Sequence, residues 1–124
     1  MVYLVAALLL SIAMQSPLRN QFPFLVVVWP TYLHLLVLGW LTQLIFGVAF
    51  WLFPKHSAAH PRGSDLLGWT SFWLLNLGLI LRAVAEPRQA LGGETGALLI
   101  VAAAAQLAAG WAFVLNTWPR VRER

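Results

Sequence analysis

Residues 30–53 read PTYLHLLVLGWLTQLIFGVAFWLF, an apolar run without Lys, Arg, Asp or Glu. A transmembrane α-helix needs about 20 predominantly apolar residues, so this run is long enough to cross a bilayer. Pro30 suits the first turn of a helix, where its missing N–H leaves no hydrogen bond unmade. The run therefore predicts a membrane-spanning helix, and it places one ionisable residue, His34, about one turn inside that helix.

Three further apolar runs extend this prediction to the whole chain. They cover residues 2–15, 65–85 and 96–118 and are separated by proline, glycine and charged residues. The run at 2–15 is short, since a span needs roughly 17 residues at least. It lacks the basic start and the small-residue cleavage site of a signal peptide, so we interpret it as a retained helix. The predicted fold class is all-α: a single transmembrane domain over residues 1–124, built as a bundle of four transmembrane helices.

Residues between the runs predict where the helices begin and end. Residues 22–29 contain Pro23 and precede Pro30, and they favour an extended or interfacial lead-in. Ser64 is a typical N-cap residue for the third helix. Residues 86–95 contain a proline and two glycines and predict a loop, and Pro119 is predicted to end the fourth helix.

Composition excludes several classes of protein. Hydrophobic residues make up 60% of the chain and charged residues 10%, against about 25% charged in a typical soluble domain. A chain of 124 residues cannot bury that much apolar surface in its own core, so the lipid bilayer is the predicted environment. The net charge of +4 comes from scattered residues rather than a basic patch, which argues against a nucleic-acid partner. The lack of cysteine excludes disulfides, thiolate metal sites and covalent c-type haem.

The distribution of basic residues predicts the orientation in the membrane. With four spans, both termini share a side with the second loop. That side holds five basic residues, Lys55, Arg62, Arg120, Arg122 and Arg124, and the other side holds three, Arg19, Arg82 and Arg88. Because Lys and Arg concentrate on the cytoplasmic side, we expect a multi-pass protein of the cell inner (cytoplasmic) membrane with both termini in the cytoplasm.

Two residues inside the predicted spans are candidates for a functional site. His34 is flanked by leucines, and an ionisable side chain within a span marks a functional site by default. A neutral imidazole is a good axial ligand for haem iron; the alternative is a histidine hydrogen-bonded to a neighbouring helix. Arg82 is predicted at a similar depth, where its guanidinium suits a porphyrin propionate or a quinone head group. The alternative for Arg82 is snorkelling or a pair with Glu86 at i,i+4 spacing.

Other polar residues predict packing or only a weak site. His56 and His60 also have i,i+4 spacing, but they lie in a proline-flanked loop without a carboxylate or thiolate nearby, so the signal for metal binding is weak. Asn76 and Asn116 are expected to hydrogen-bond to neighbouring helices. The acidic residues are placed at span ends or in loops, which predicts no proton path of buried carboxylates.

Two stretches of the sequence resemble a known family. His34–Thr42 (HLLVLGWLT), followed by IFGV at 45–48 and LFP at 52–54, resembles a helix of the haem-copper oxidase catalytic-subunit superfamily, where the pattern is H-x-H-L-x-x-x-G-W. FWLLNLG at 72–78 resembles the next helix, typically H-F-W-L-x-N-x-G. The likeness covers less than half of the chain and is closest to short stand-alone relatives of the nitric oxide reductase and cytochrome oxidase subunit I group.

The resemblance implies a b-type haem site near the outer face, with His34 as the ligand of the haem iron. Tyr32 and Ser71 stand where the family pattern has two further histidines. The chain also lacks the histidine cluster of a copper centre, so we do not expect it to act as an oxidase or reductase by itself.

These observations lead to two hypotheses of function. The first is a membrane protein that binds haem b through His34, with Arg82 nearby, and that takes part in electron transfer or in haem or gas sensing. A homodimer with one His34 on each face of a shared haem, or a partner membrane subunit, would supply the second ligand. The second hypothesis is a haem-free structural or assembly subunit of a larger membrane respiratory complex. A transporter or channel is disfavoured, because the sequence predicts no charge pair or broken helix within the membrane.

Overall fold

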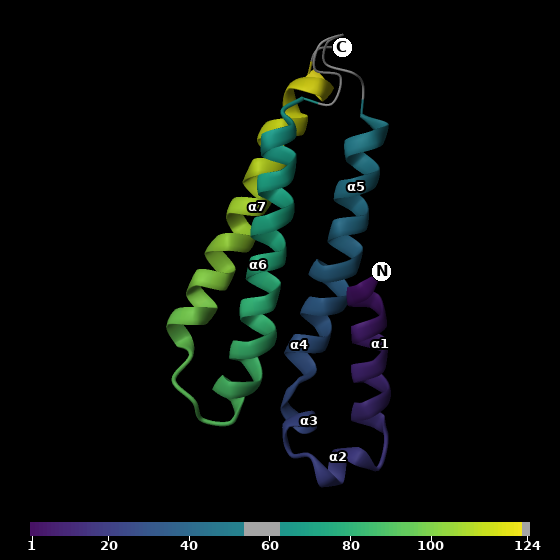
Figure 1. The fold of residues 1–124 in the computed structure, drawn as a ribbon, viewed down its shortest axis with the longest axis vertical. Coiled ribbons are helices and arrows are strands. Elements are labelled where there is room, and N and C mark those ends of the chain that lie inside the picture. Colours follow the sequence, from purple (N-terminus) through teal and green to yellow (C-terminus); the bar gives the residue numbers. More distant parts are fainter. Residues whose placement is uncertain (54–62, 123–124) are drawn as a thin grey trace.

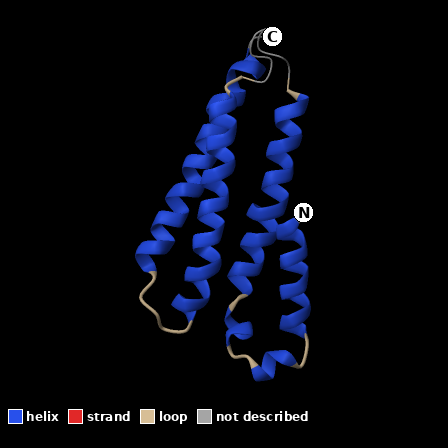
Figure 2. Ribbon diagram, viewed as in Figure 1, coloured by secondary structure: helices blue, strands red, loops and turns tan. Residues whose placement is uncertain are grey.

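The computed structural model describes residues 1–53 and 63–122, and within these ranges every regular element is a helix (Figure 2). The predicted all-α class is therefore confirmed for the described residues. The main elements are α1 (Val2–Gln15), a continuous helix made of α4 (Trp29–His34), η1 (Leu35–Thr42) and α5 (Gln43–Leu52), and the two long helices α6 (Asp65–Ala90) and α7 (Gly96–Arg122).

Three of these helices are long and apolar enough to cross a membrane: Trp29–Leu52, Asp65–Ala90 and Gly96–Val121. Large apolar side chains cover much of their outer surface, as expected for helices that face lipid. The helix α1 has 14 residues and is therefore about 21 Å long, shorter than the roughly 30 Å of a hydrocarbon core. Figure 1 shows the N-terminus beside the middle of the neighbouring helix, so the structure supports three candidate spans where the sequence predicted four.

The helices α6 and α7 form an antiparallel hairpin, and small residues allow them to approach closely. A Cβ on Gly78 would lie 2.8 Å from the carbonyl oxygen of Ala102, so only glycine allows this close approach. Ser71 Oγ donates to the carbonyl oxygen of Ala109 at 2.9 Å, and Leu75 and Leu79 are buried beside it. Small residues and interhelical hydrogen bonds replace the hydrophobic effect as the source of helix association in lipid.

Proline residues do not end α6 and α7, and this corrects the predicted loop at 86–95. The helix α6 continues through Pro87 to Ala90, and α7 continues through Pro119 to Arg122. A proline in the last turns removes only one backbone hydrogen bond. Thr95 Oγ1 supports the end of α6, because it donates to the carbonyl oxygen of Ala85 at 2.9 Å.

Residues 22–29 are mostly helical, so the extended conformation predicted as one alternative is found only at Phe22; the interfacial alternative stays a prediction. Between α1 and α4 lie two four-residue helices, α2 (Leu18–Gln21) and α3 (Phe24–Val27). Each follows a proline with φ close to −57°, which is already the φ of a helix. The chain therefore turns between α1 and α4 through short helical segments (Figure 1).

The segment η1 departs from regular α-helical geometry over eight residues and was not predicted. Its hydrogen bonds follow the π-helical i→i+5 pattern, which is rare and is frequent at functional sites. It packs against α1, where Gly39 lies so close to Tyr3 that a Cβ on the glycine would be 2.8 Å from the tyrosine Cβ. This segment begins directly after His34.

Candidate functional site

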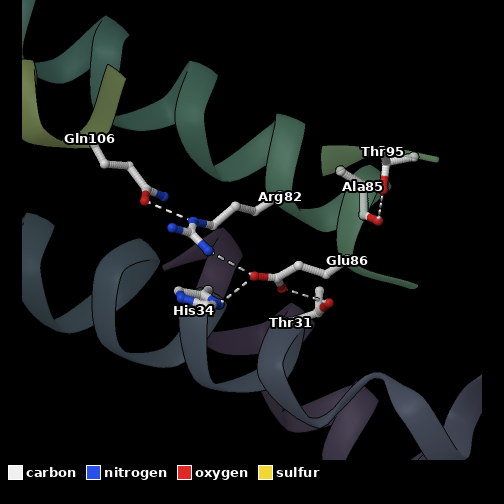
Figure 3. A network of polar contacts seen from close by, with 7 residues as sticks. All are labelled: Thr31, His34, Arg82, Ala85, Glu86, Thr95 and Gln106. Carbon is white, nitrogen blue, oxygen red and sulfur yellow. Dashed lines mark hydrogen bonds and ion pairs between the residues drawn. The ribbon is translucent and has the colours of Figure 1, made fainter. Parts of the chain in front are cut away.

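A buried carboxylate, Glu86, connects the two candidate residues that the sequence analysis selected. Glu86 Oε1 lies 2.8 Å from Nδ1 of His34 and 3.1 Å from Nη1 of Arg82. Its other oxygen, Oε2, accepts a hydrogen bond from Thr31 Oγ1 at 2.9 Å. Figure 3 shows His34 and Thr31 pointing from α4 towards α6, with Glu86 between them and the guanidinium of Arg82. Two hydrogen-bond donors, Thr31 and Arg82, and the imidazole of His34 thus converge on one carboxylate.

Arg82 extends this network to a third helix. Its Nε donates to Oε1 of Gln106 on α7 at 2.9 Å, while its Nη1 donates to Oε1 of Glu86. Nε2 of the same Gln106 side chain is buried and has no hydrogen-bond partner among the described residues. The network of Thr31, His34, Arg82, Glu86 and Gln106 therefore links α4, α6 and α7.

Burial makes this network electrostatically significant. The side chain of Glu86 is 8% exposed, whereas those of His34 and Arg82 are 29% and 21% exposed. An unpaired carboxylate at this depth would be costly, because neither lipid nor protein solvates it as water does. Arg82 supplies the compensating charge, and Thr31 supplies a neutral hydrogen bond to the second oxygen.

The orientation of the His34 ring determines which of its nitrogens is available. Nδ1 faces Glu86 at a distance typical of an ion pair, although its N–H does not have the angle of a hydrogen bond. Nε2 lies on the opposite side of the ring (Figure 3) and makes no polar contact within residues 1–53 and 63–122. A histidine held at one nitrogen by a carboxylate is the usual arrangement of a metal-ligating imidazole, in which the other nitrogen binds the metal.

The π-helical segment η1 explains why both His34 and Gln43 face the neighbouring helix α6. In a regular α-helix each residue advances by about 100°, so that His34 and Gln43 would lie on opposite faces. A π-turn holds more residues than an α-turn, so each residue of η1 advances by a smaller angle. Both side chains consequently face α6, where Gln43 Nε2 donates to Oδ1 of Asn76 at 3.2 Å.

A second polar cluster lies along the same side of α6. Oδ1 of Asn76 also accepts a hydrogen bond from the hydroxyl of Tyr3 on α1 at 2.5 Å, and Asn76 Nδ2 donates to the carbonyl oxygen of Phe72 at 2.7 Å. The prediction that Asn76 bonds to neighbouring helices is therefore confirmed. This cluster joins α1, α5 and α6 and carries no charge, so its role is to hold helices together.

A third polar cluster lies near the end of α7. Oδ1 of Asn116 accepts a hydrogen bond from the backbone N–H of Ser64 at 2.7 Å, and the hydroxyl of Ser64 caps α6 by accepting from the N–H of Leu67 at 3.4 Å, as predicted for an N-cap. Arg120 Nη2 donates to the carbonyl oxygens of Phe50 and Phe53 at 3.0 and 2.7 Å. Arg120 thereby anchors the end of α5 to α7.

Sequence reasoning missed Glu86 as a member of the site. The residue was assigned to a loop, because Pro87 follows it, and its i,i+4 spacing from Arg82 was the only signal of a buried role. Ser71, at the position of a histidine in the family pattern, hydrogen-bonds to α7 instead. His56 and His60 lie outside the described residues. Within the described ranges, no group of three or more His, Cys, Asp or Glu side chains is arranged to hold a metal ion.

Comparison of the chain with known protein families, curated proteins and solved structures finds no match. The resemblance to the haem-copper oxidase superfamily therefore stays a prediction from sequence motifs.

Proposed function

We propose that this protein binds haem b in the membrane, with Nε2 of His34 as an axial ligand of the haem iron, and that it takes part in electron transfer or in haem or gas sensing. The observation that carries the proposal is the contact of 2.8 Å between His34 Nδ1 and Glu86 Oε1. A carboxylate at Nδ1 favours the tautomer with its proton on that nitrogen, and it leaves the lone pair of Nε2 for a metal.

The residues around His34 fit the iron of a haem better than its propionates. The imidazole is oriented and partly exposed, so a ligand can approach it from the lipid or from another protein chain. The sequence leaves Arg82 either a propionate or quinone head group, or a pair with Glu86, as its partner; its guanidinium is bonded to Glu86 and also to Gln106. Arg82 therefore supports the site through Glu86 in this proposal, and the propionates need other partners.

Bound haem would supply a one-electron redox couple or a gas-binding iron, whose properties depend on the second axial ligand. Glu86 would hold the ring of His34 in one orientation, and Arg82 would balance the charge of Glu86. The described residues offer one such imidazole. A second copy of the chain, related by two-fold symmetry, or a partner membrane subunit would provide the second ligand.

The proposal includes the predicted arrangement in the membrane. We place α1 as a short fourth helix of the bundle, both termini on the cytoplasmic side and the protein in the cell inner membrane. The contact of Gly39 with Tyr3 supports a fixed position of α1 against the second helix, and the excess of basic residues near the C-terminus supports the orientation. Because α1 is shorter than a usual span, it would depend on its neighbours for its position.

A haem-free structural or assembly subunit of a membrane respiratory complex is the second candidate. It is favoured by one observation: Arg82, Glu86 and Thr31 satisfy one another and thereby fasten α4 to α6 without any ligand. In that case, the same network would serve only to hold the helices together, and the exposed apolar faces would contact partner subunits.

Absorption spectroscopy separates these two functions. The detergent-purified protein, expressed with ample haem, should show a Soret band in the oxidised state and sharp α and β bands after reduction with dithionite. The bands should be lost in His34→Ala and kept in Ser71→Ala, a control that changes a polar residue of α6 outside the network. A colourless wild-type protein would exclude haem binding, and copurification with membrane subunits would then support the structural function.

A further inference from the structure

A cavity of about 520 Å³ lies between α5, α6 and α7, on the opposite side of the Gln43–Asn76 hydrogen bond from His34. Figure 1 shows α5 diverging from α6 towards the end that carries Phe53. None of the five residues of the His34 network lines the cavity. Its size falls within the range of about 300–1,000 Å³ that is typical of small-molecule sites.

Aromatic side chains dominate the wall of this cavity. Six of its 12 lining residues are aromatic: Phe46, Phe50, Trp51, Trp69, Phe72 and Phe113. The rings of Phe46 and Phe113 are stacked on each other with an interplanar angle of 4° and centroids 3.9 Å apart, which joins α5 to α7 at the cavity wall. Trp51 and Trp69 are 71% and 61% exposed, so the cavity can be reached from the lipid. Such a wall suits a flat, lipophilic ring more than a flexible acyl chain.

A buried hydrogen-bond donor without a partner lies next to the cavity. Asn116 is 5% exposed, and its Nδ2 has no hydrogen-bond partner among the described residues. This nitrogen lies 3.8 Å from the position that a Cβ on Gly68 would occupy, and Gly68 lines the cavity. Gln43 and Ser71 also line it: Gln43 Nε2 donates one of its two amide hydrogens to Asn76, and the hydroxyl of Ser71 donates to the carbonyl oxygen of Ala109. A buried amide N–H requires an acceptor, so a ligand with a carbonyl oxygen would complete the site.

We propose that this cavity binds the head group of an isoprenoid quinone, which combines a flat ring, carbonyl oxygens and a lipid-soluble tail. A quinone carbonyl would accept a hydrogen bond from Asn116 Nδ2, the ring would lie among the aromatic side chains, and the tail would leave towards the bilayer beside Trp51 and Trp69. The proposal is independent of haem binding, because the two sites share no residue. Either can therefore fail while the other holds.

The test is photolabelling of the full-length, detergent-purified protein with a photoreactive azidoquinone that carries a short isoprenoid tail, followed by peptide mass spectrometry. A Cβ on Gly47, which lines the cavity, would have no atom within 4 Å, so Gly47→Leu places a side chain in the cavity space. Gly110→Leu is the matched control, because Gly110 also has open space around it and does not line the cavity. Asn116→Asp keeps the acceptor for the N–H of Ser64 and replaces the donor with an acceptor. Thermal unfolding shows that each variant is folded.

The proposal predicts label on residues 43–53 and 65–75 and competition by an excess of the same quinone without the azide. In Gly47→Leu, the quinone concentration for half-maximal competition should rise at least about tenfold, or labelling should vanish, whereas Gly110→Leu should behave as wild type. Asn116→Asp should also weaken labelling. Label spread over all lipid-facing helices, or cavity label unchanged in both Gly47→Leu and Asn116→Asp, would overturn the proposal.

Discussion

His34 Nδ1 and Glu86 Oε1 lie 2.8 Å apart, although one residue belongs to the second long helix and the other to the end of α6. The contact places an imidazole and a carboxylate together inside a predominantly apolar chain. The carboxylate is compensated by Arg82 and hydrogen-bonded by Thr31, and it lies against Nδ1 of His34. Four predictions test how the network and the helix contacts around it contribute to the structure.

Removing the charge of Glu86 should destabilise the protein. In Glu86→Gln, Arg82 loses its charged partner and keeps only neutral acceptors at position 86 and at Gln106. We expect a loss of about 2–3 kcal/mol, below the roughly 3–5 kcal/mol for breaking a fully buried ion pair, because Arg82 is partly exposed. Thermal or denaturant unfolding in detergent measures the change. Glu94→Gln, at an exposed loop position, is the control and should leave stability unchanged. Equal stability of both variants would contradict a stabilising role of the network.

Replacing the guanidinium of Arg82 should break its hydrogen bond from α6 to Gln106 on α7. Arg82 contacts Glu86 and Gln106 through two different nitrogens, and the single ammonium group of lysine cannot reproduce this geometry. We expect Arg82→Lys to lose about 1–2 kcal/mol of unfolding free energy. Arg88→Lys, on the exposed part of the same helix, should have no effect. If both variants unfold at the same temperature, the bond to Gln106 does not contribute to stability.

Enlarging Gly78 should separate α6 from α7. A Cβ there would lie 2.8 Å from the carbonyl oxygen of Ala102, and a backbone atom cannot move aside as the end of a side chain does. Gly78→Ala should therefore lower the free energy of unfolding by about 1–3 kcal/mol. Gly47→Ala is the matched control, since nothing lies within 4 Å of its Cβ, and it should be neutral or slightly stabilising. If Gly78→Ala leaves the free energy of unfolding unchanged, the helices separate at this position without loss of stability.

Removing the guanidinium of Arg120 should loosen the end of α5. Arg120 is 3% exposed and donates to the carbonyl oxygens of Phe50 and Phe53, which the helix leaves without backbone donors. In Arg120→Gln, hydrogen exchange of the backbone amides in residues 48–53 should be at least about tenfold faster, since a tenfold change corresponds to the loss of about 1.4 kcal/mol. Amides in the middle of α6 provide the internal control and should exchange as before. Uniformly faster exchange would indicate general destabilisation instead of a local anchor.

The membrane character of the chain follows from its sequence, because hydropathy is a local property. The run at 30–53 and the two later runs contain enough consecutive apolar residues to cross a bilayer whatever they pack against. The sequence also predicts the N-cap role of Ser64, because an N-cap depends on adjacent residues. It predicts an interhelical hydrogen bond of Asn76, because a buried amide needs a partner wherever it lies. Hydropathy alone does not decide whether the first run spans the bilayer. Its 14 residues are compatible with a span only when the neighbouring helices adapt to its short length.

The composition of the site was decided by tertiary structure. The sequence placed His34 and Arg82 within spans, but it placed Glu86 in a loop, because a proline follows it. The helix continues past Pro87, since a proline this close to the end of α6 removes only one backbone hydrogen bond. Glu86 could then face α4. Which residue it meets depends on the rotation of the second long helix, and the π-helical turns of η1 change that rotation so that His34 and Gln43 both face α6. Apolar periodicity does not encode this rotation when nearly every residue of the helix is apolar; the contacts with α1 and α6 fix it.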